Sequence, residues 1–234
     1  MRAKTLLIVG SGPGIALKTA LLFASRGFTH IALISRTQSN LDKTASSIAA
    51  QYATVDVSTH ACDVGNTQSL TSALAAVEKA LSGPPEVILF NAANVSPSSL
   101  GHVPASRLVA DFSITTAALY TTATTLLPKM SEGNPTLLIT GGYIYHTPFP
   151  PLFSLSASKA SQFNLSGSLA QVYGPLGVHV ATVVINGTVE EEGEGEMSAK
   201  KIAEQLWKQY EERNGRKKGE MSVVRWGTGA RKGS

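Results

Sequence analysis

The sequence has little cysteine, little charge and few aromatic residues. Its one cysteine, Cys62, cannot form a disulfide bond within the chain. No cationic leader followed by an apolar stretch opens the sequence, so we expect a cytoplasmic protein. Formal charge is absent from residues 160–189, but Gln162, Asn164 and the Gly174-Pro175 pair interrupt this stretch. It therefore predicts a buried helix and strand, and no membrane span.

The composition predicts one globular domain. Of the 234 residues, 43% are hydrophobic and 15% are charged, which is enough apolar surface for a core and too little charge for disorder. The net charge of +4 comes from the end of the chain, because residues 213–234 hold seven Lys and Arg against one acidic residue. Residues 1–212 hold 13 Lys and Arg against 15 Asp and Glu. We therefore expect a solvated basic tail and no nucleic-acid partner, with a contact to a polyanion as the weaker alternative.

Apolar runs and stretches with helical periodicity alternate along the chain. Parallel strands that are covered on both faces have continuous apolar runs, and crossover helices join them. The alternation predicts an α/β fold, a single-domain Rossmann-type doubly wound parallel sheet of about seven strands. The expected strands are 5–9, 30–35, 58–64, 86–91, 136–140, 178–185 and 221–225, and the expected helices are 16–25, 40–51, 67–81, 105–130, 156–173 and 198–213.

Two of the expected helices carry very little charge. Residues 105–130 contain only Arg107, Asp111 and Lys129, and residues 156–173 contain only Lys159. A helix with one solvated face normally has more charged residues. We therefore expect these two helices to pair with those of a second copy of the chain in a homodimer or homotetramer. An exposed surface rich in serine and threonine is the alternative.

The segment 190–197 contains five glutamates and two glycines. It cannot pack as a core, and it follows a strand at the edge where doubly wound sheets bind ligands. We expect either a lid over the site or a solvated loop without a catalytic role.

A glycine-rich turn, Gly10-Ser11-Gly12-Pro13-Gly14-Ile15-Ala16, joins the first strand to the first helix. Glycines let the backbone approach a pyrophosphate, and the free amides at a helix N-terminus bind the anion. The position of this turn predicts a dinucleotide-binding loop.

The end of the second strand predicts which dinucleotide binds. An enzyme that selects NAD usually has an acidic residue there, whereas an arginine beside hydroxyl groups can bind the 2′-phosphate of NADP. The sequence has Ser35-Arg36-Thr37 and no acidic residue. We therefore expect NADP(H), with a plain surface arginine as the alternative.

From these motifs onward the sequence resembles the short-chain dehydrogenase/reductase family as far as about residue 213. Cys62-Asp63-Val64 is similar to the family's adenine-contacting pair, Asn91-Ala92-Ala93-Asn94 to its Asn-Asn-Ala-Gly segment, Ser156-Ala157-Ser158-Lys159-Ala160 to its active-site helix, and Asn186-Gly187-Thr188-Val189 to its nicotinamide-contacting turn. The resemblance implies an NADP(H)-binding domain over residues 1–213, to which residues 214–234 add a last strand and the basic tail. It also implies that Lys159 is a catalytic residue, the one member of the family's catalytic set that this sequence retains, and that it contacts the ribose.

The resemblance also shows departures from the family's catalytic residues. The family has a proton-donating Tyr four residues before the active-site Lys, a Ser that polarises the carbonyl group and an Asn that completes a proton relay. This sequence has Leu155 at the Tyr position, glycine after Thr140 in place of the Ser, and Thr115 where the Asn is expected. It therefore resembles an atypical member that lacks the usual proton donor.

Tyr143, Tyr145 and His146 follow the fifth strand directly and could supply a proton instead, while packing is the ordinary role of such residues. Thr140 and Ser154 are weaker candidates. No cluster with metal-ligand spacing appears, so we expect no metal. The segments around 95–102 and 143–153 predict an apolar substrate pocket.

Three functions remain open at the level of sequence. The first is an NADPH-dependent oxidoreductase with a degenerate catalytic tetrad, acting on a small apolar carbonyl- or imine-like substrate. The second is an isomerase or cyclase without net redox chemistry, and the third is a non-catalytic NADP-binding protein. Retention of so many nicotinamide-side features favours the first.

Overall fold

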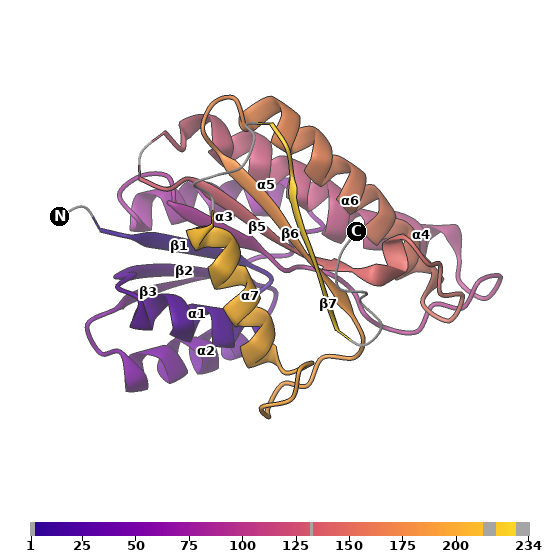
Figure 1. Ribbon diagram of the computed structural model, residues 1–234, viewed down its shortest axis with the longest axis horizontal. Coiled ribbons are helices and arrows are strands. Elements are labelled where there is room, and N and C mark those ends of the chain that lie inside the picture. The colour runs from indigo at the N-terminus through magenta and orange to yellow at the C-terminus, as the bar shows by residue number, and fades with distance from the viewer. Residues whose placement is uncertain (1–2, 132, 213–218, 228–234) are drawn as a thin grey trace.

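Seven parallel strands form one sheet at the centre of the fold, in the order β3-β2-β1-β4-β5-β6-β7 (Figure 1). The structure is a computed structural model that describes residues 3–131, 133–212 and 219–227. Apolar side chains fill β4, the centre of β2 and all of β1 except Thr5, and they are buried because helices cover both faces of the sheet. The strands are β1 (Thr5–Val9), β2 (His30–Ser35), β3 (Asp56–Ala61), β4 (Val87–Phe90), β5 (Thr136–Gly142), β6 (His179–Asn186) and β7 (Ser222–Gly227).

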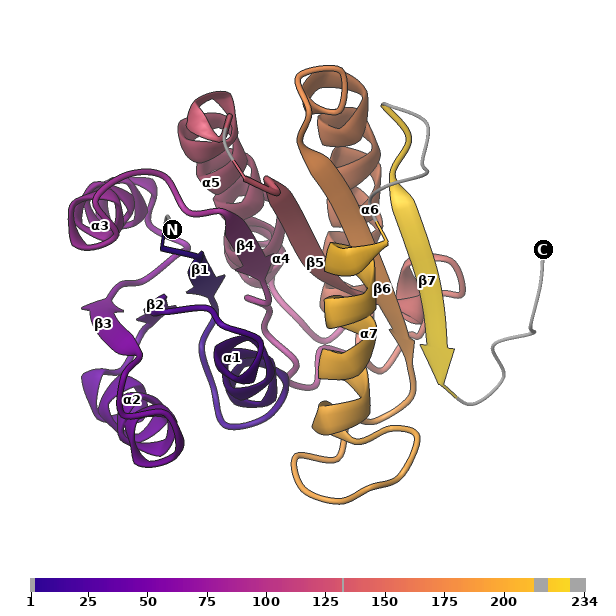
Figure 2. The same cartoon turned by 60° about the vertical axis from the view of Figure 1, so that its left-hand side comes forward.

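Two layers of helices enclose this sheet (Figure 2). Each layer packs on the sheet through its own apolar core. One layer contains α1 (Ile15–Ser25), α2 (Gln38–Gln51) and α7 (Ala199–Glu211). The other contains α3 (Thr67–Ala80), α4 (Ala105–Phe112), α5 (Ala118–Leu126) and α6 (Phe153–Tyr173). The predicted Rossmann-type α/β fold with about seven parallel strands is therefore confirmed.

Some predicted boundaries were wrong. Residues 105–130 are not one α-helix. A short π-helix at Ser113–Ala117, called the π-turn below, separates α4 from α5, and a 3₁₀ turn at Leu127–Lys129 follows α5. Pro128 lacks the N–H that a longer α-helix would need. The third strand ends at Ala61, its last residue paired with β2, and the Asp63 carboxylate then accepts a hydrogen bond from the N–H of Gly65 in a turn.

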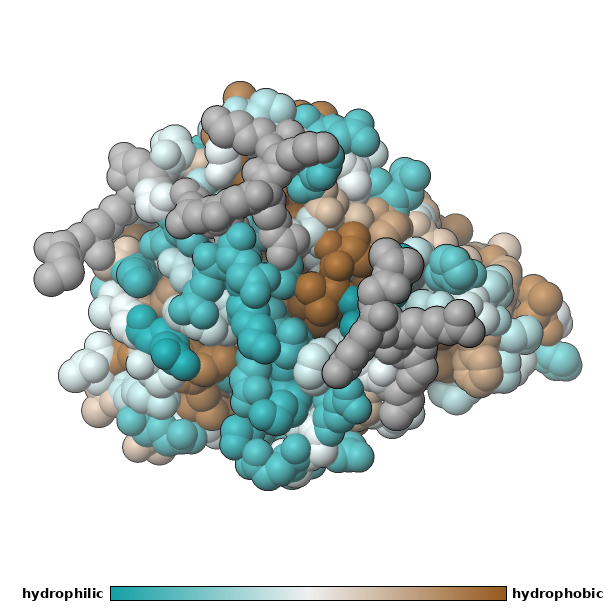
Figure 3. Space-filling view, in the orientation of Figure 1, coloured by the Kyte–Doolittle hydropathy of each residue, from teal (hydrophilic) through white to brown (hydrophobic). Residues whose placement is uncertain are grey.

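Hydrophilic side chains cover the outward face of α7, and a hydrophobic area lies beside it over β7 (Figure 3). Of the predicted basic tail, Arg225 lies on β7. The other six basic residues, Arg213, Arg216, Lys217, Lys218, Arg231 and Lys232, lie outside the described residues. Within the described ranges, no helix is both long and apolar enough to cross a membrane.

The sheet order creates a crevice between β1 and β4. The chain leaves β1 toward β2 on one side, whereas β4 continues toward β5 on the other. The connections that follow these two strands therefore diverge, and ligands of doubly wound sheets bind in the crevice that opens at their carboxyl ends.

Candidate functional site

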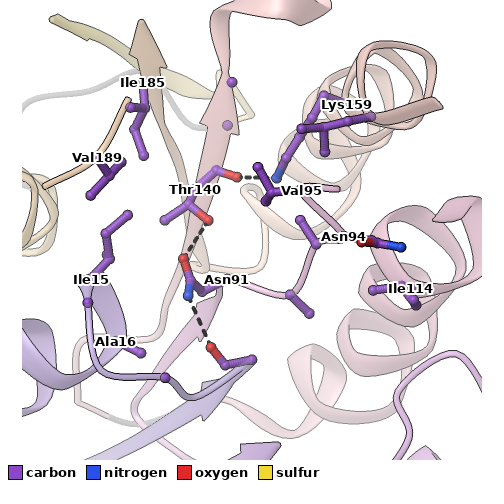
Figure 4. A pocket seen from close by; sticks show the side chains of 18 of the residues that line it. Ile15, Ala16, Asn91, Asn94, Val95, Ile114, Thr140, Lys159, Ile185 and Val189 are labelled. Atoms are coloured by element: carbon purple, nitrogen blue, oxygen red, sulfur yellow. Dashed lines mark hydrogen bonds between the residues drawn. The ribbon is translucent and has the colours of Figure 1, made fainter. Parts of the chain in front are cut away.

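A cleft of about 890 Å³ opens at the carboxyl ends of the central strands (Figure 4). It brings together the glycine-rich turn after β1, the residues after β2, β4 and β5, the start of α6 and the turn after β6. Of the residues expected to bind a cofactor, the cleft is lined by Gly10, Ser11, Gly12, Gly14, Ile15, Ser35, Arg36, Val64, Asn91, Ala92, Ala93, Lys159, Gly187, Thr188 and Val189. Thr37 and Asp63 do not line it; Thr37 precedes α2 as its N-cap residue.

The glycine-rich turn has the features of an anion site. A side chain at Gly12 would meet no atom within 4 Å, so the backbone there is open to the cleft. Helix α1 begins after Gly14 with no side-chain cap and no acidic residue in its first turn. The buried hydroxyl of Ser11 has no hydrogen-bond partner among the described residues. These unsatisfied donors fit the pyrophosphate of a dinucleotide.

A chain of hydrogen bonds fixes the turn against the neighbouring strands (Figure 4). The Thr140 hydroxyl donates to Asn91 Oδ1 at 2.9 Å, and Asn91 Nδ2 donates to the carbonyl oxygen of Gly10 at 3.0 Å. On the other side, the N–H groups of Gly10 and Ser11 both donate to the carbonyl oxygen of Ile34. The turn is therefore held by β2, β4 and β5 together, and Thr140 and Asn91 have a clear structural role.

Arg36 lies at one end of the cleft, directly after β2. Its side chain is exposed and makes no ion pair with any residue in the described ranges. Ser35 lines the cleft beside it. A free guanidinium group next to a hydroxyl is suited to bind a phosphate monoester.

Lys159 enters the cleft from α6 and is only 7% exposed. Its Nζ atom donates to the carbonyl oxygen of Thr140 at 2.7 Å and to Gln162 Oε1 at 2.9 Å. Both partners are neutral. Burial lowers the pKa of Lys159 to about 7, because the surrounding protein solvates the charged form poorly.

The cleft wall around Lys159 is apolar. Leu155, one turn before Lys159 on α6, is buried and lines the cleft. Gly141 and Gly142 line it at the end of β5, where a side chain at Gly141 would meet Thr182 at 2.9 Å. Val95, Ile144, Phe149 and Leu152 complete this wall. This part of the cleft suits an apolar ligand of small or moderate size.

Of the three residues expected to replace the proton donor, Tyr143 lines the cleft and Tyr145 and His146 do not. The Tyr145 ring stacks on Phe163 with centroids 4.1 Å apart, and its hydroxyl accepts a hydrogen bond from Arg225 at 3.2 Å. His146 is exposed. Packing on α6 therefore turns Tyr145 away from the cleft, whereas Tyr143 keeps its place in it.

The acidic segment 190–197 forms a closed loop. Glu190 and Ser198 form a bridge at its base, and the Trp226 indole donates to the Glu196 carbonyl oxygen at 2.7 Å. Glu192 binds Lys18 of α1 at 2.9 Å. Glu191 lines the cleft near Gly14, so a carboxylate lies beside the anion site.

A buried carboxylate, paired with a partly exposed arginine, supports the side of the cleft that contains Asn94. Asp111 of α4 is 1% exposed and binds Arg107 at 2.9 Å. Its carboxylate also accepts hydrogen bonds from Asn94 at 2.8 Å and from Ser154 at 2.6 Å. Ser154 is thus satisfied by Asp111, and the cluster ties the loop after β4 to the start of α6.

Comparison with known proteins places the chain in a family. Residues 4–201 match the short chain dehydrogenase family. This protein belongs to the short-chain dehydrogenase family. Within this family it is 31% identical over 184 residues to a very-long-chain 3-oxoacyl-CoA reductase of Phaeosphaeria nodorum, a match that covers 76% of this chain and 52% of that protein. It is 30% identical over 167 residues to short-chain dehydrogenase/reductase 3 of Homo sapiens, a match that covers 71% of this chain and 54% of that protein. The chain thus spans about half the length of these curated relatives.

Solved structures share the fold of this short-chain dehydrogenase. An NADPH-bound short-chain oxidoreductase of Pseudomonas aeruginosa PAO1, which contains an atypical catalytic centre, superposes with a TM-score of 0.81 at 19% identity and covers 94% of this chain and 95% of that one. An acetoin dehydrogenase of Salmonella typhimurium superposes with a TM-score of 0.82 at 20% identity, and the match covers 96% of this chain and 96% of that one. At such identities the likeness is one of fold alone.

Sequence reasoning missed several residues of the cleft in this short-chain dehydrogenase. Ile114 lines it, whereas Thr115 points into the interior with 0% exposure, because the π-turn rotates the chain there. Glu191 and Cys62 also line it. No sequence signal marks the π-turn, whereas Glu191 belongs to the acidic segment 190–197, which the sequence places at the ligand-binding edge of the sheet.

Proposed function

We propose that this short-chain dehydrogenase is an NADPH-dependent oxidoreductase that acts on a small apolar carbonyl- or imine-like substrate and lacks the usual tyrosine. The observation that carries the proposal is the single cleft that runs from the glycine-rich turn and Arg36 to Lys159 and the apolar wall around Leu155. The names of the relatives, among them 3-oxoacyl-CoA reductases, support a carbonyl substrate. Residues 1–213 are the proposed NADP(H)-binding region, completed by the strand and tail in 214–234.

The residues present fit the parts of NADPH in order along the cleft. Arg36 and Ser35 would hold the 2′-phosphate, and the turn from Gly10 to Ile15 would hold the pyrophosphate. Lys159 would bind the ribose hydroxyl groups, with Gly187 and Thr188 beside the carboxamide. Bound NADPH would supply a hydride to the substrate.

Leu155 has no group that donates a proton, so the protein must help the reaction in another way. We propose that the apolar wall excludes water and orients the substrate, and that the hydroxyl of Tyr143, which lines the cleft, is the candidate donor. An iminium or conjugated carbonyl substrate would need little help from an acid.

The test of the proposed function is calorimetric titration with NADPH and NADH, followed by assay of NADPH oxidation with oxoacyl thioesters, ketones and imines. We expect micromolar binding of NADPH and oxidation with at least one class. Absence of binding by both nucleotides contradicts the proposal. Binding without oxidation, together with product formation independent of added nucleotide, would instead support an isomerase or cyclase, which the apolar Leu155 also permits.

Glu191→Gln should tighten NADPH binding about fivefold at low salt, because a carboxylate beside the pyrophosphate site repels the ligand's phosphates. The dissociation constant at low and high salt measures this effect. Glu194→Gln is the matched control, since Glu194 pairs with Lys200 at 2.8 Å and does not line the cleft. Equal effects of the two variants would show that only the net charge of the loop matters.

We also propose a homodimer or homotetramer formed through helices 105–130 and 156–173. Large apolar side chains are exposed on these helices, namely Val109, Phe112, Tyr120 and Val172. Light scattering should give at least twice the 24.5 kDa mass of the chain. Val109→Glu combined with Phe112→Glu should reduce this mass to that of a monomer. A monomeric wild-type protein would contradict the proposal.

A further inference from the structure

Gln162, which accepts a hydrogen bond from Lys159, also reaches a second element of the helical layer. Gln162 lies one turn after Lys159 on α6 and is 1% exposed. Its Oε1 atom accepts a hydrogen bond from Lys159 Nζ at 2.9 Å. Its Nε2 atom donates to the carbonyl oxygen of Thr115 at 3.3 Å. The side-chain amide therefore connects Lys159 to the π-turn.

The π-turn presents its polar groups to the same stretch of α6. Thr116 donates to the carbonyl oxygen of Ser158 at 3.3 Å and lies 2.5 Å from the Ser161 hydroxyl. These contacts fix the Thr115 carbonyl opposite Gln162. One N–H of the Gln162 amide is bonded to the π-turn, and its oxygen is directed at Lys159.

We infer that Gln162 is a positioning residue that holds the ammonium group of Lys159 at the cleft with a neutral acceptor. The inference rests on the proposed function, in which Lys159 binds the cofactor ribose. Two of the three Nζ donors go to Gln162 and Thr140, so the third remains for a ligand in the cleft. The orientation of this third donor depends on Gln162.

Because Gln162 is neutral, neither hydrogen-bond partner of Lys159 Nζ brings a negative charge that would stabilise the ammonium form. Neither β5 nor the π-turn, both in contact with Lys159 or Gln162, carries an ionisable side chain. On the other elements against α6, Arg107 and Asp111 of α4 pair with each other, Tyr143 lies in the cleft, and Tyr145 pairs with Arg225. Helix α5 carries Tyr120, which is exposed, and β6 carries His179, which lies opposite Thr136 at the far end of β5 from Thr140. Burial is the cause that lowers the pKa of Lys159 to about 7.

A carboxylate at position 162 should reverse this effect. In Gln162→Glu an anion would lie beside Nζ and stabilise the protonated form, so the pKa of Lys159 should rise. With the wild-type residue, Lys159 is protonated below about pH 7 and loses its proton as the pH rises through that value. With glutamate, the charged form should persist to a pH about two units higher or more.

Carbon-13 NMR of protein labelled at the lysine ε-carbons measures this titration without any cofactor. The signal that is lost in Lys159→Met identifies Lys159. We expect a midpoint near pH 7 in the wild-type protein and about two pH units higher in Gln162→Glu. Asn164→Asp adds the same charge on the exposed face of α6 and should leave the midpoint unchanged. Equal midpoints in the wild-type and Gln162→Glu proteins would overturn the inference.

Gln162→Met keeps the approximate shape of the side chain but removes the oxygen that accepts the hydrogen bond from Lys159. This variant tests the inference if Gln162→Glu does not fold. The midpoint of Lys159 should fall, and NADPH should bind about tenfold more weakly because Nζ is no longer fixed. Unchanged values for both quantities would mean that Gln162 only fills space. Failure of the wild-type protein to bind NADPH would reject the proposed function, while the NMR titration still decides the role of Gln162.

Discussion

Gly10→Ala should destabilise the protein by about 3 kcal/mol or more, because both the backbone conformation and the neighbouring backbone exclude a side chain there. Gly10 has a φ angle of +91°, which L-residues rarely adopt. A Cβ atom there would also lie 2.5 Å from the backbone N of Ala92 and 2.7 Å from its Cα. Both obstacles are backbone atoms of the segment after β4, which the hydrogen bond from the Asn91 N–H to the Val9 carbonyl oxygen holds against β1. Thermal and urea unfolding measure the loss.

Gly12→Ala is the matched control for this prediction. Gly12 lies in the same turn, its φ angle is not positive, and an added Cβ would meet no atom within 4 Å. The stability of this variant should change by less than about 0.5 kcal/mol. Its Cβ would enter the cleft, however, so the affinity for NADPH should fall. If both variants unfold alike, the turn is not held against β4 as described.

The two glycines show what the sequence could and could not predict. The spacing of Gly10, Gly12 and Gly14 between an apolar run and a helical pattern predicts the phosphate-binding turn, because only a few local arrangements satisfy that pattern. It does not tell which glycine is required by packing and which by ligand approach. That distinction depends on β4, which lies about 80 residues farther along the chain.

The sequence likewise predicts the strands and most helices but not the contacts between distant segments. Continuous apolar strands and alternating helices predict the fold, because burial on both faces of a parallel sheet requires that composition. The sequence does not predict the π-turn, because the run Ile114-Thr115-Thr116 is compatible with an ordinary helix and the contacts of the π-turn are with α6, about 45 residues farther along the chain. The separation of Tyr143 from Tyr145 depends on stacking with Phe163, a contact between residues 18 positions apart.

Arg36→Ala should weaken NADPH binding about 100-fold and change NADH binding by less than about threefold. Hydrogen bonds between charged groups contribute roughly 1.5–3 kcal/mol each, and the guanidinium group can make two of them to one phosphate. NADH has a hydroxyl group in place of the 2′-phosphate of NADPH, so its affinity for the protein should change little. Calorimetric titration of both nucleotides with wild-type and variant protein gives the four dissociation constants.

Lys43→Ala is the control for this charge effect, because Lys43 is exposed on α2 and does not line the cleft. It removes the same charge and should change the NADPH dissociation constant less than twofold at physiological salt, where exposed charges more than about 8 Å apart are screened. If Arg36→Ala weakens NADPH and NADH equally, Arg36 acts on the adenosine or on the shape of the loop. A selective loss of NADPH affinity would instead identify the 2′-phosphate as its target, since the two ligands differ only there.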